Sequence, residues 1–82
     1  MKDWWDEPVR VVISDRGIRD VERLEKAAEM LLAEWPEQNG PAYINAKEAL
    51  TKALQDPSSD SARAAARMAF AAAADEAGIL RE

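Results

Sequence analysis

The first regular pattern along the chain is an alternation of apolar and polar residues between Pro8 and Ser14. A period of two is typical of a β-strand with one buried face. The apolar positions that recur with this period are Val9, Val11 and Ile13. We therefore predict a half-buried strand over these residues. Because the strand carries few charges, we also predict that it is the sheet edge on which another chain could pair.

A turn follows this strand at residues 15–17, which read Asp-Arg-Gly. A three-residue loop, with Gly17 at positive φ, sets Val11 opposite Val21. A two-residue loop would instead set Val21 opposite Arg10, and a slip of one residue turns the side chains of a strand to the other face. We therefore predict an antiparallel hairpin with the three-residue loop.

A one-sided apolar stripe begins at Leu24 and recurs at the three- and four-residue spacings of a helix. Its members are Leu24, Ala27, Ala28, Leu31, Leu32 and Trp35. Pro36 disfavours helical geometry in the residue before it, so we expect this helix to end at Trp35. The residues from Glu37 to Gly40 are expected to form a turn.

Pro41 suits the first position of a second helix, where its missing N–H costs nothing. The expected inner face of that helix consists of Tyr43, Ala46, Leu50, Ala53 and Leu54. Asp56 and Pro57 are expected to end it. Either Ser58 or Ser59 then caps the N-terminus of the next helix.

The third expected helix runs from about Asp60 to Ala77 and consists largely of alanine, the residue with the highest helix propensity. Gly78 suits the left-handed position after a helix, and Ile79 suits the hydrophobic contact of a Schellman cap. The helix is therefore expected to end on a defined local signal.

The alanines exceed what one buried helix face requires. We expect an inner stripe of Ala62, Ala66, Ala69, Phe70, Ala73 and Ala77, which leaves outside it Ala64, Ala65, Ala71, Ala72, Ala74 and Met68. Small side chains let helix axes approach toward the lower end of the range of about 8–10 Å. The second face either contacts another protein, a second copy included, or is solvated, because alanine is tolerated on surfaces.

The composition fits a single domain over residues 1–82 and excludes several classes of function. The net charge is −5 and the pI is about 4.7. An acidic chain argues against nucleic-acid binding and against docking on anionic membranes. The sequence contains no cysteine, no signal-peptide pattern and no apolar run long enough for a membrane span, so we expect a cytoplasmic protein.

Together these elements predict an α+β fold, in which an N-terminal two-stranded antiparallel β-hairpin packs on three α-helices in the order ββααα. A set of residues spread along the chain forms a further pattern: Trp5, Pro8-Val9, Arg19 with Val21, Leu31-Leu32, Trp35-Pro36, Gly40, Tyr43, Ala66-Arg67, Phe70 and Glu76-Ala77-Gly78-Ile79. In these residues the chain resembles the bacterial domain-of-unknown-function family 982. The resemblance covers nearly the whole chain and implies a small α+β fold. It implies no activity and no functional residue.

The sequence lacks histidine and cysteine, and with them the commonest general base, metal ligand and thiol nucleophile. Asp3, Asp6 and Glu7 could bind a hard cation through carboxylate oxygens, but a solvated acidic segment is the simpler interpretation. We therefore expect no cofactor, no metal and no enzymatic activity.

Five residues are candidates for an interaction surface: Trp4, Trp5, Arg63, Arg67 and Met68. Adjacent strand residues face opposite ways, so at most one of the two tryptophans easily reaches the core. The other either covers the hairpin edge or contacts a partner. Arg63 and Arg67 share a helix face, where they could bind a carboxylate or pair with acids such as Glu34 or Glu48.

The favoured function is a non-enzymatic protein-interaction or accessory domain, with self-association as a homodimer among the partners considered. The alternative is a small-ligand binding domain that recognises an anionic group through Arg63 and Arg67.

Overall fold

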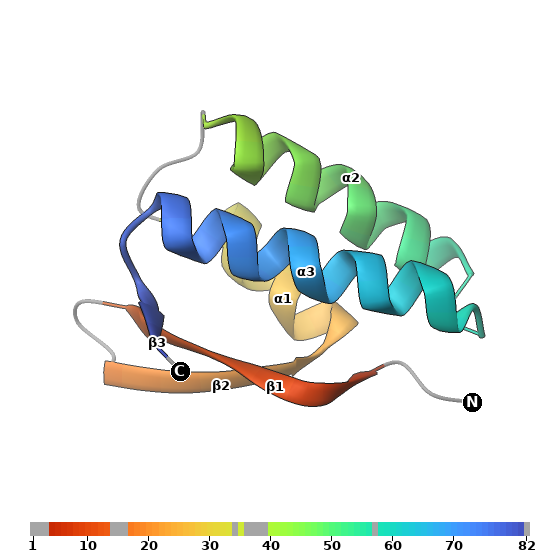
Figure 1. The fold of residues 1–82 in the computed structure, drawn as a ribbon, viewed down its shortest axis with the longest axis horizontal. Coiled ribbons are helices and arrows are strands. Elements are labelled where there is room, and N and C mark those ends of the chain that lie inside the picture. Colours follow the sequence, from red (N-terminus) through yellow and green to blue (C-terminus); the bar gives the residue numbers. More distant parts are fainter. Residues whose placement is uncertain (1–3, 14–16, 34, 36–39, 57, 82) are drawn as a thin grey trace.

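The computed structural model describes residues 4–13, 17–33, 35, 40–56 and 58–81, without the side chains of residues 4–7 and 13. The elements in chain order are β1 (Trp4–Ile13), β2 (Gly17–Arg23), α1 (Leu24–Ala33), α2 (Pro41–Gln55), α3 (Asp60–Glu76) and β3 (Leu80–Arg81) (Figure 1). The predicted α+β fold, a hairpin followed by three helices, is confirmed. The short strand β3 is an addition that the sequence pattern did not predict.

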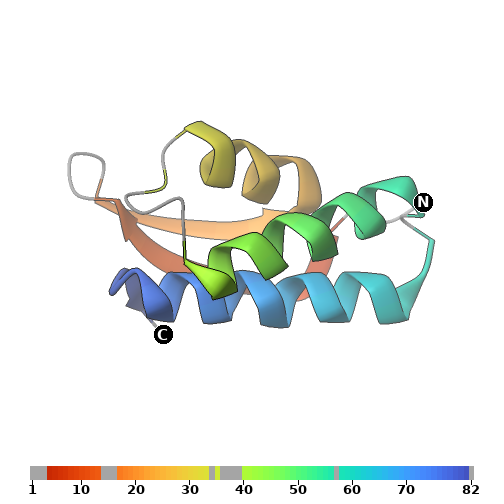
Figure 2. The same ribbon diagram turned by 90° about the horizontal axis from the view of Figure 1, so that it is seen from above.

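The described elements stack in layers, with the sheet on one side and the helices on the other (Figure 1). The strand order in the sheet is β2-β1-β3. Helix α1 packs on β2 and helix α3 packs on β1, while α2 contacts both helices (Figure 2). The sheet therefore presents one face to the helices, and none of the other described elements covers its opposite face, which we call the open face.

The hairpin register differs from the predicted one. Val9 pairs with Val21, whereas Val11 pairs with Arg19, so the pairing is offset by two residues along β1. Ile13 pairs with Gly17, which leaves three connecting residues, 14–16, outside the described part of the chain. The predicted positive φ of Gly17, 75°, is confirmed. Gly17 is, however, the first residue of β2 and does not belong to the loop in which we expected it. An offset of two preserves the buried face, which is why the alternation alone could not distinguish the two registers.

Strand β1 is the central strand, so the prediction that it is an open edge is wrong where β3 covers it. Arg10 pairs with Arg81 and Val11 pairs with Leu80. The backbone N–H of Val12 donates a hydrogen bond to the carbonyl of Ile79 at 2.9 Å. A two-residue strand is too short to produce a recognisable period, so the sequence pattern did not indicate it.

The predicted Schellman cap at the end of α3 is confirmed, and it directs the chain into β3. Gly78 has a φ of 74°, in the left-handed region that glycine adopts without strain. Its N–H bonds the carbonyl of Asp75 at 3.1 Å, and the N–H of Ile79 bonds the carbonyl of Ala74 at 2.9 Å. At the other end of α3, the hydroxyl of Ser59 accepts from the N–H of Ala62 at 3.1 Å, which identifies Ser59 as the N-cap.

Helix α1 ends at Ala33, two residues before the predicted end. Its buried face includes Met30, whereas Leu32 is 64% exposed. Trp35 nevertheless lies in the core, where its ring centroid is 5.2 Å from that of Phe70. The predicted stripe was therefore wrong at Leu32, because the buried face of α1 is shifted toward Met30. Trp35 reaches the core from beyond the end of the helix.

Within the part of the chain that the structure describes, a cluster of buried apolar residues joins the sheet to all three helices. Its members are Val9, Val11, Val21, Leu24, Ala27, Met30, Leu31, Trp35, Tyr43, Ala46, Leu50, Ala53, Ala66, Ala69, Phe70, Ala73 and Ala74. The predicted inner face of α3 is confirmed at its centre, whereas Ala74, which we expected outside it, is fully buried. Small side chains on both α2 and α3 allow these two helices to pack closely along their length.

Helix α2 takes its N-terminal cap from another helix. Gly40, at the N-cap position, has no side chain to offer. The carboxylate of Glu76, from the last turn of α3, accepts hydrogen bonds from the N–H groups of Ala42 at 3.2 Å and Tyr43 at 3.3 Å. A Cβ at Gly40 would overlap this carboxylate. A negative charge is unfavourable at the C-terminus of its own helix, but here it lies against the positive end of α2.

We expect Glu76→Ala to lower the free energy of unfolding by about 0.5–2 kcal/mol, the usual effect of removing a helix cap. Urea unfolding monitored by circular dichroism measures this change. Asp75→Ala removes the same charge from the same helix turn, without an α2 contact among the described residues, and should leave stability unchanged or slightly raised. Equal losses in the two variants would rule out the capping role.

Candidate functional site

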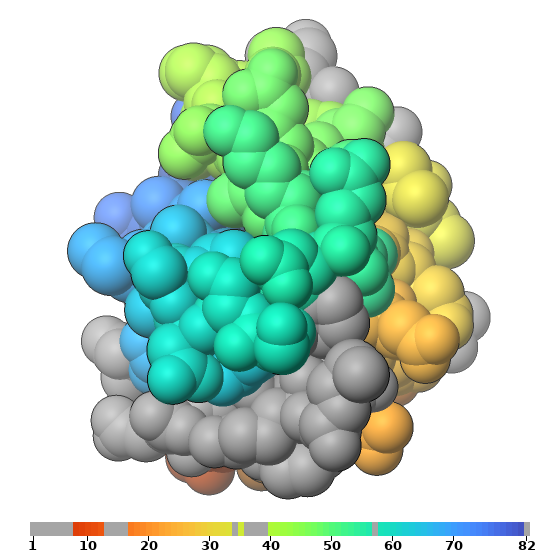
Figure 3. All heavy atoms as spheres, turned by 90° about the vertical axis from the view of Figure 1, so that its right-hand side faces the viewer, coloured from red at the N-terminus to blue at the C-terminus, as the bar shows by residue number. Residues whose placement is uncertain are grey.

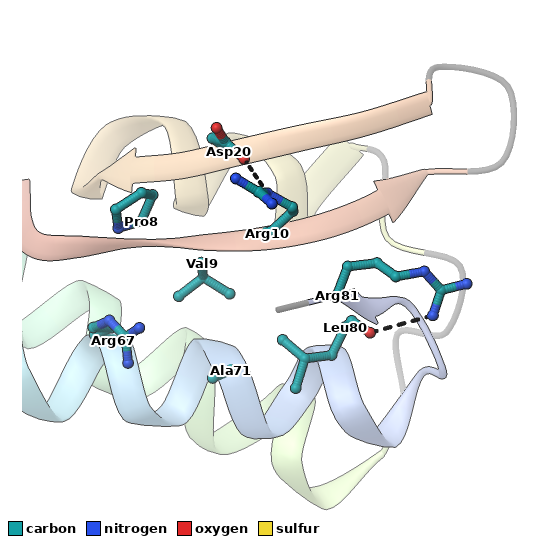
Figure 4. A pocket seen from close by; sticks show the side chains of 8 residues that line it. All are labelled: Pro8, Val9, Arg10, Asp20, Arg67, Ala71, Leu80 and Arg81. Atoms are coloured by element: carbon teal, nitrogen blue, oxygen red, sulfur yellow. Dashed lines mark hydrogen bonds and ion pairs between the residues drawn. The ribbon is translucent and has the colours of Figure 1, made fainter.

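A groove opens between β1, the short strand β3 and the side of α3 that faces β1. Its lining consists of Pro8, Val9, Arg10, Asp20, Arg67, Ala71, Leu80 and Arg81, and its volume is about 310 Å³ (Figure 4). We call it the arginine groove. It unites residues from the beginning, middle and end of the chain.

The two sheet arginines of the groove occupy one cross-strand row. Arg10 pairs with Asp20 of β2 on one side and with Arg81 of β3 on the other. Because side chains alternate along a strand and both Val9 and Val11 are buried, Arg10 lies on the open face of the sheet. Its Nε donates to Oδ1 of Asp20 at 2.9 Å, and both side chains are about half exposed, at 51% and 54%.

The third arginine comes from α3. Arg67 rises from this helix on the side toward β1, one helical turn before Ala71, which also lines the groove (Figure 4). Arg81 makes a long hydrogen bond of 3.4 Å to the carbonyl of Leu80, and its guanidinium turns away from Arg67 (Figure 4). The three cations are therefore spread around the groove and do not meet at one point.

The charge of the groove contrasts with that of the chain. Three guanidinium groups and one carboxylate line it, whereas the protein as a whole carries a net charge of −5. A guanidinium presents several N–H donors in a planar fork that matches a carboxylate or a phosphate. The groove can therefore attract and orient an oxyanion, although the rest of the chain repels one.

The two arginines predicted to act as a pair are separated by the fold. Arg67 lines the groove, whereas Arg63 does not and is 6% exposed. Arg63 forms an ion pair with Asp60, three residues earlier on α3. We expected Glu34 or Glu48 as a partner. Glu48 does not take part in this ion pair, and Glu34 lies outside the described residues.

The other predicted surface residues do not join the groove. Met68 is 70% exposed on α3. Trp4 and Trp5 belong to β1 by their backbone, but their side chains lie outside the described part of the structure. The same holds for the side chains of Asp6 and Glu7, and Asp3 is outside it altogether. The structure therefore brings one predicted residue, Arg67, together with two that sequence reasoning missed, Arg10 and Arg81.

Two further hollows lie between described parts of the helices. The first, of about 60 Å³, lies between α1 and α2 and includes the exposed side chains of Leu32 and Leu54. The second, of about 270 Å³, lies between α2 and α3, where Ala65 and Ala69 leave space beside Glu48 and Lys52. These two helices lie side by side on the face seen in Figure 3. The first hollow is too small for a ligand. In the second hollow, the opposite charges of Glu48 and Lys52 cancel.

No described part of the structure gathers three acidic, histidine or cysteine residues into a metal-binding group. Among the described helices, none combines the length and hydropathy required to cross a membrane. The groove offers arginines and one ion-paired aspartate, and this combination suits binding better than proton transfer.

Among the comparisons with known proteins, a family model matches most of the chain and assigns no activity. Neither a curated protein nor a solved structure matches the chain significantly. A family model described as "protein of unknown function (DUF982)" matches residues 7–81, which include every helix and nearly all of the sheet. The chain belongs to the DUF982 family.

Proposed function

We propose that this chain is a non-enzymatic cytoplasmic binding domain that recognises an anionic group of its ligand in the arginine groove. The observation that carries the proposal is that Arg10, Arg67 and Arg81 all line one groove in an acidic protein. Charge-assisted hydrogen bonds from guanidinium groups to oxyanions are among the stronger polar contacts in proteins. A groove of this kind is suited to the accessory role expected from the sequence.

The scaffold supports such a role because the groove rests on regular elements. Arg10 and Arg81 stand on paired strands, and Arg67 stands near the middle of a helix of 17 residues. Val9 and Ala71 form part of its apolar lining. A few charged groups above an apolar floor are typical of small-ligand sites.

We expect inorganic pyrophosphate, used as a probe at constant ionic strength, to shift the NMR amide signals of groove residues more than those of α2. Arg67→Gln and Arg81→Gln should each weaken binding by about tenfold, the value of one hydrogen bond to a charged group. Lys52→Gln removes an equal charge from the far end of α2 and should change the affinity by less than about twofold.

The proposal fails if all three variants weaken binding equally, because a diffuse electrostatic effect would then explain the affinity. It also fails if the amide shifts lie outside the groove. Circular dichroism of each variant verifies that the fold is retained, so that a loss of binding can be assigned to the side chain that was changed.

A further inference from the structure

We infer that the outer face of α1 and α2 is the surface on which two copies of this chain associate about a two-fold axis. This surface, the α1–α2 face, consists of Glu29, Leu32, Ile44, Lys47, Thr51 and Leu54. It shares no residue with the lining of the arginine groove, so the inference goes beyond the proposed function and does not depend on it.

The α1–α2 face is the most apolar exposed surface among the described helices. It holds three of the five large apolar side chains that are exposed in the described structure, with Leu32 64%, Ile44 51% and Leu54 39% exposed. Leu32 and Leu54 also line the hollow of about 60 Å³ between the two helices, where the charged residue of the lining is Lys47. This hollow can take one aliphatic side chain from a partner surface. Grouped exposed apolar side chains of this kind are typical of protein contacts.

The α2 part of this face fits a second copy because its pattern is the same in both directions. Ile44, Lys47, Thr51 and Leu54 follow one another at spacings of three, four and three residues, so they share one side of the helix. In an antiparallel pair of α2 helices, Ile44 lies opposite Leu54 of the second copy, and Lys47 lies opposite its Thr51. A two-fold contact requires a self-complementary surface of this kind.

Helix α1 adds a carboxylate at the position that the second copy's lysine reaches. The hydroxyl of Tyr43, at the start of α2, donates to the carbonyl of Leu31, near the end of α1, at 2.9 Å, and the two helices run antiparallel (Figure 2). The exposed Glu29 therefore lies beside the second half of α2, at the level of Thr51. Lys47 of the second copy reaches the same level. The two-fold axis forms this Glu29–Lys47 pair twice.

Both charges are available for a contact between copies. Within the described structure, neither Glu29 nor Lys47 forms an ion pair. The ammonium group of Lys47 lies 5.5 Å from the centre of the Tyr43 ring. Two chains that each carry a net charge of −5 repel one another. A contact between them is favoured where unlike charges face each other, as they do twice at the α1–α2 face.

Sedimentation of the wild-type chain at concentrations up to about 1 mM tests the association. We expect the mass to rise from 9.1 kDa toward twice that value. Ile44→Glu should weaken the dimer at least about tenfold, because the contact would desolvate the new charge. Met68→Glu adds the same charge on the exposed side of α3 and should change the affinity by less than about twofold.

A wild-type mass that stays at 9.1 kDa would overturn the inference and would leave the α1–α2 face to a different protein. Equal effects of Ile44→Glu and Met68→Glu would also overturn it, because the contact would then lie elsewhere. Both positions are exposed, so the circular dichroism spectra of the two variants should match that of the wild type.

An exchange of charges tests the two-fold arrangement itself. Glu29→Lys and Lys47→Glu should each weaken self-association by about three- to tenfold, because each makes two attractive pairs repulsive. An equimolar mixture of the two variants should form a heterodimer with an affinity close to that of the wild-type dimer, because unlike charges then face each other again at both pairs. A mixture that associates no better than the separate variants would refute the arrangement.

Discussion

Phe70→Ala is expected to lower the free energy of unfolding by about 3–5 kcal/mol, the usual cost of deleting a buried phenyl ring. Phe70 is fully buried in the middle of α3 and contacts Trp35 across the core. It is the only phenylalanine in the chain, and its neighbours on the buried face of α3 are mostly alanines, which cannot fill the cavity. A domain of this size has a total stability of only about 4–12 kcal/mol. A large part of that stability therefore depends on one side chain.

Urea unfolding followed by circular dichroism measures this loss. Met68→Ala is the matched control, because Met68 lies two residues away on α3 and is 70% exposed. It should change stability by no more than about 0.5 kcal/mol, as surface substitutions usually do. Similar losses in the two variants would mean that the burial of Phe70 does not hold α3 against the sheet.

Ala66→Leu is expected to lower the free energy of unfolding by about 1–3 kcal/mol, because added methylene groups in a packed core force displaced side chains or backbone shifts. Ala66 is fully buried on the inner face of α3. The neighbouring helix, α2, also has alanines on its buried face, at Ala46 and Ala53. The short side chains thus set the distance between the two helices, and a leucine would have to push them apart.

Thermal and urea unfolding test this prediction, with Ala72→Leu as the control on the exposed side of the same helix. Leucine and alanine are both good helix formers, so the control should remain close to the wild-type stability. If Ala66→Leu were also neutral or stabilising, α2 and α3 would not be closely packed at this position.

The two predictions bear on why α3 contains more alanines than one buried helix face requires. The alanines of the inner face are structural, because they let α3 approach α2 and leave the large contacts to Phe70. Those of the outer face, Ala64, Ala65 and Ala72, are exposed. Their helix propensity alone is a sufficient reason for their presence.

The candidate site could be predicted only in part. Arg67 was identified from its helical spacing, but its assumed partner, Arg63, is buried beside Asp60. The observed hairpin register pairs Arg10 with Asp20. The predicted register was offset by two residues, so it did not place them opposite each other. Arg81 carried no usable signal, because its position depends on a strand of only two residues.

The sequence by itself determined the order of the hairpin and the three helices, an N-cap at Ser58 or Ser59, the Schellman cap at Gly78 and most of the buried positions. These features depend on residues within a few positions of one another, where periodicity and capping preferences act directly. Only the tertiary structure decided the hairpin register, the pairing of β3 and the capping of α2 by Glu76. The tertiary structure alone also formed the arginine groove. Contacts between distant parts of a chain depend on how the layers pack against each other, and a local sequence pattern does not contain this information.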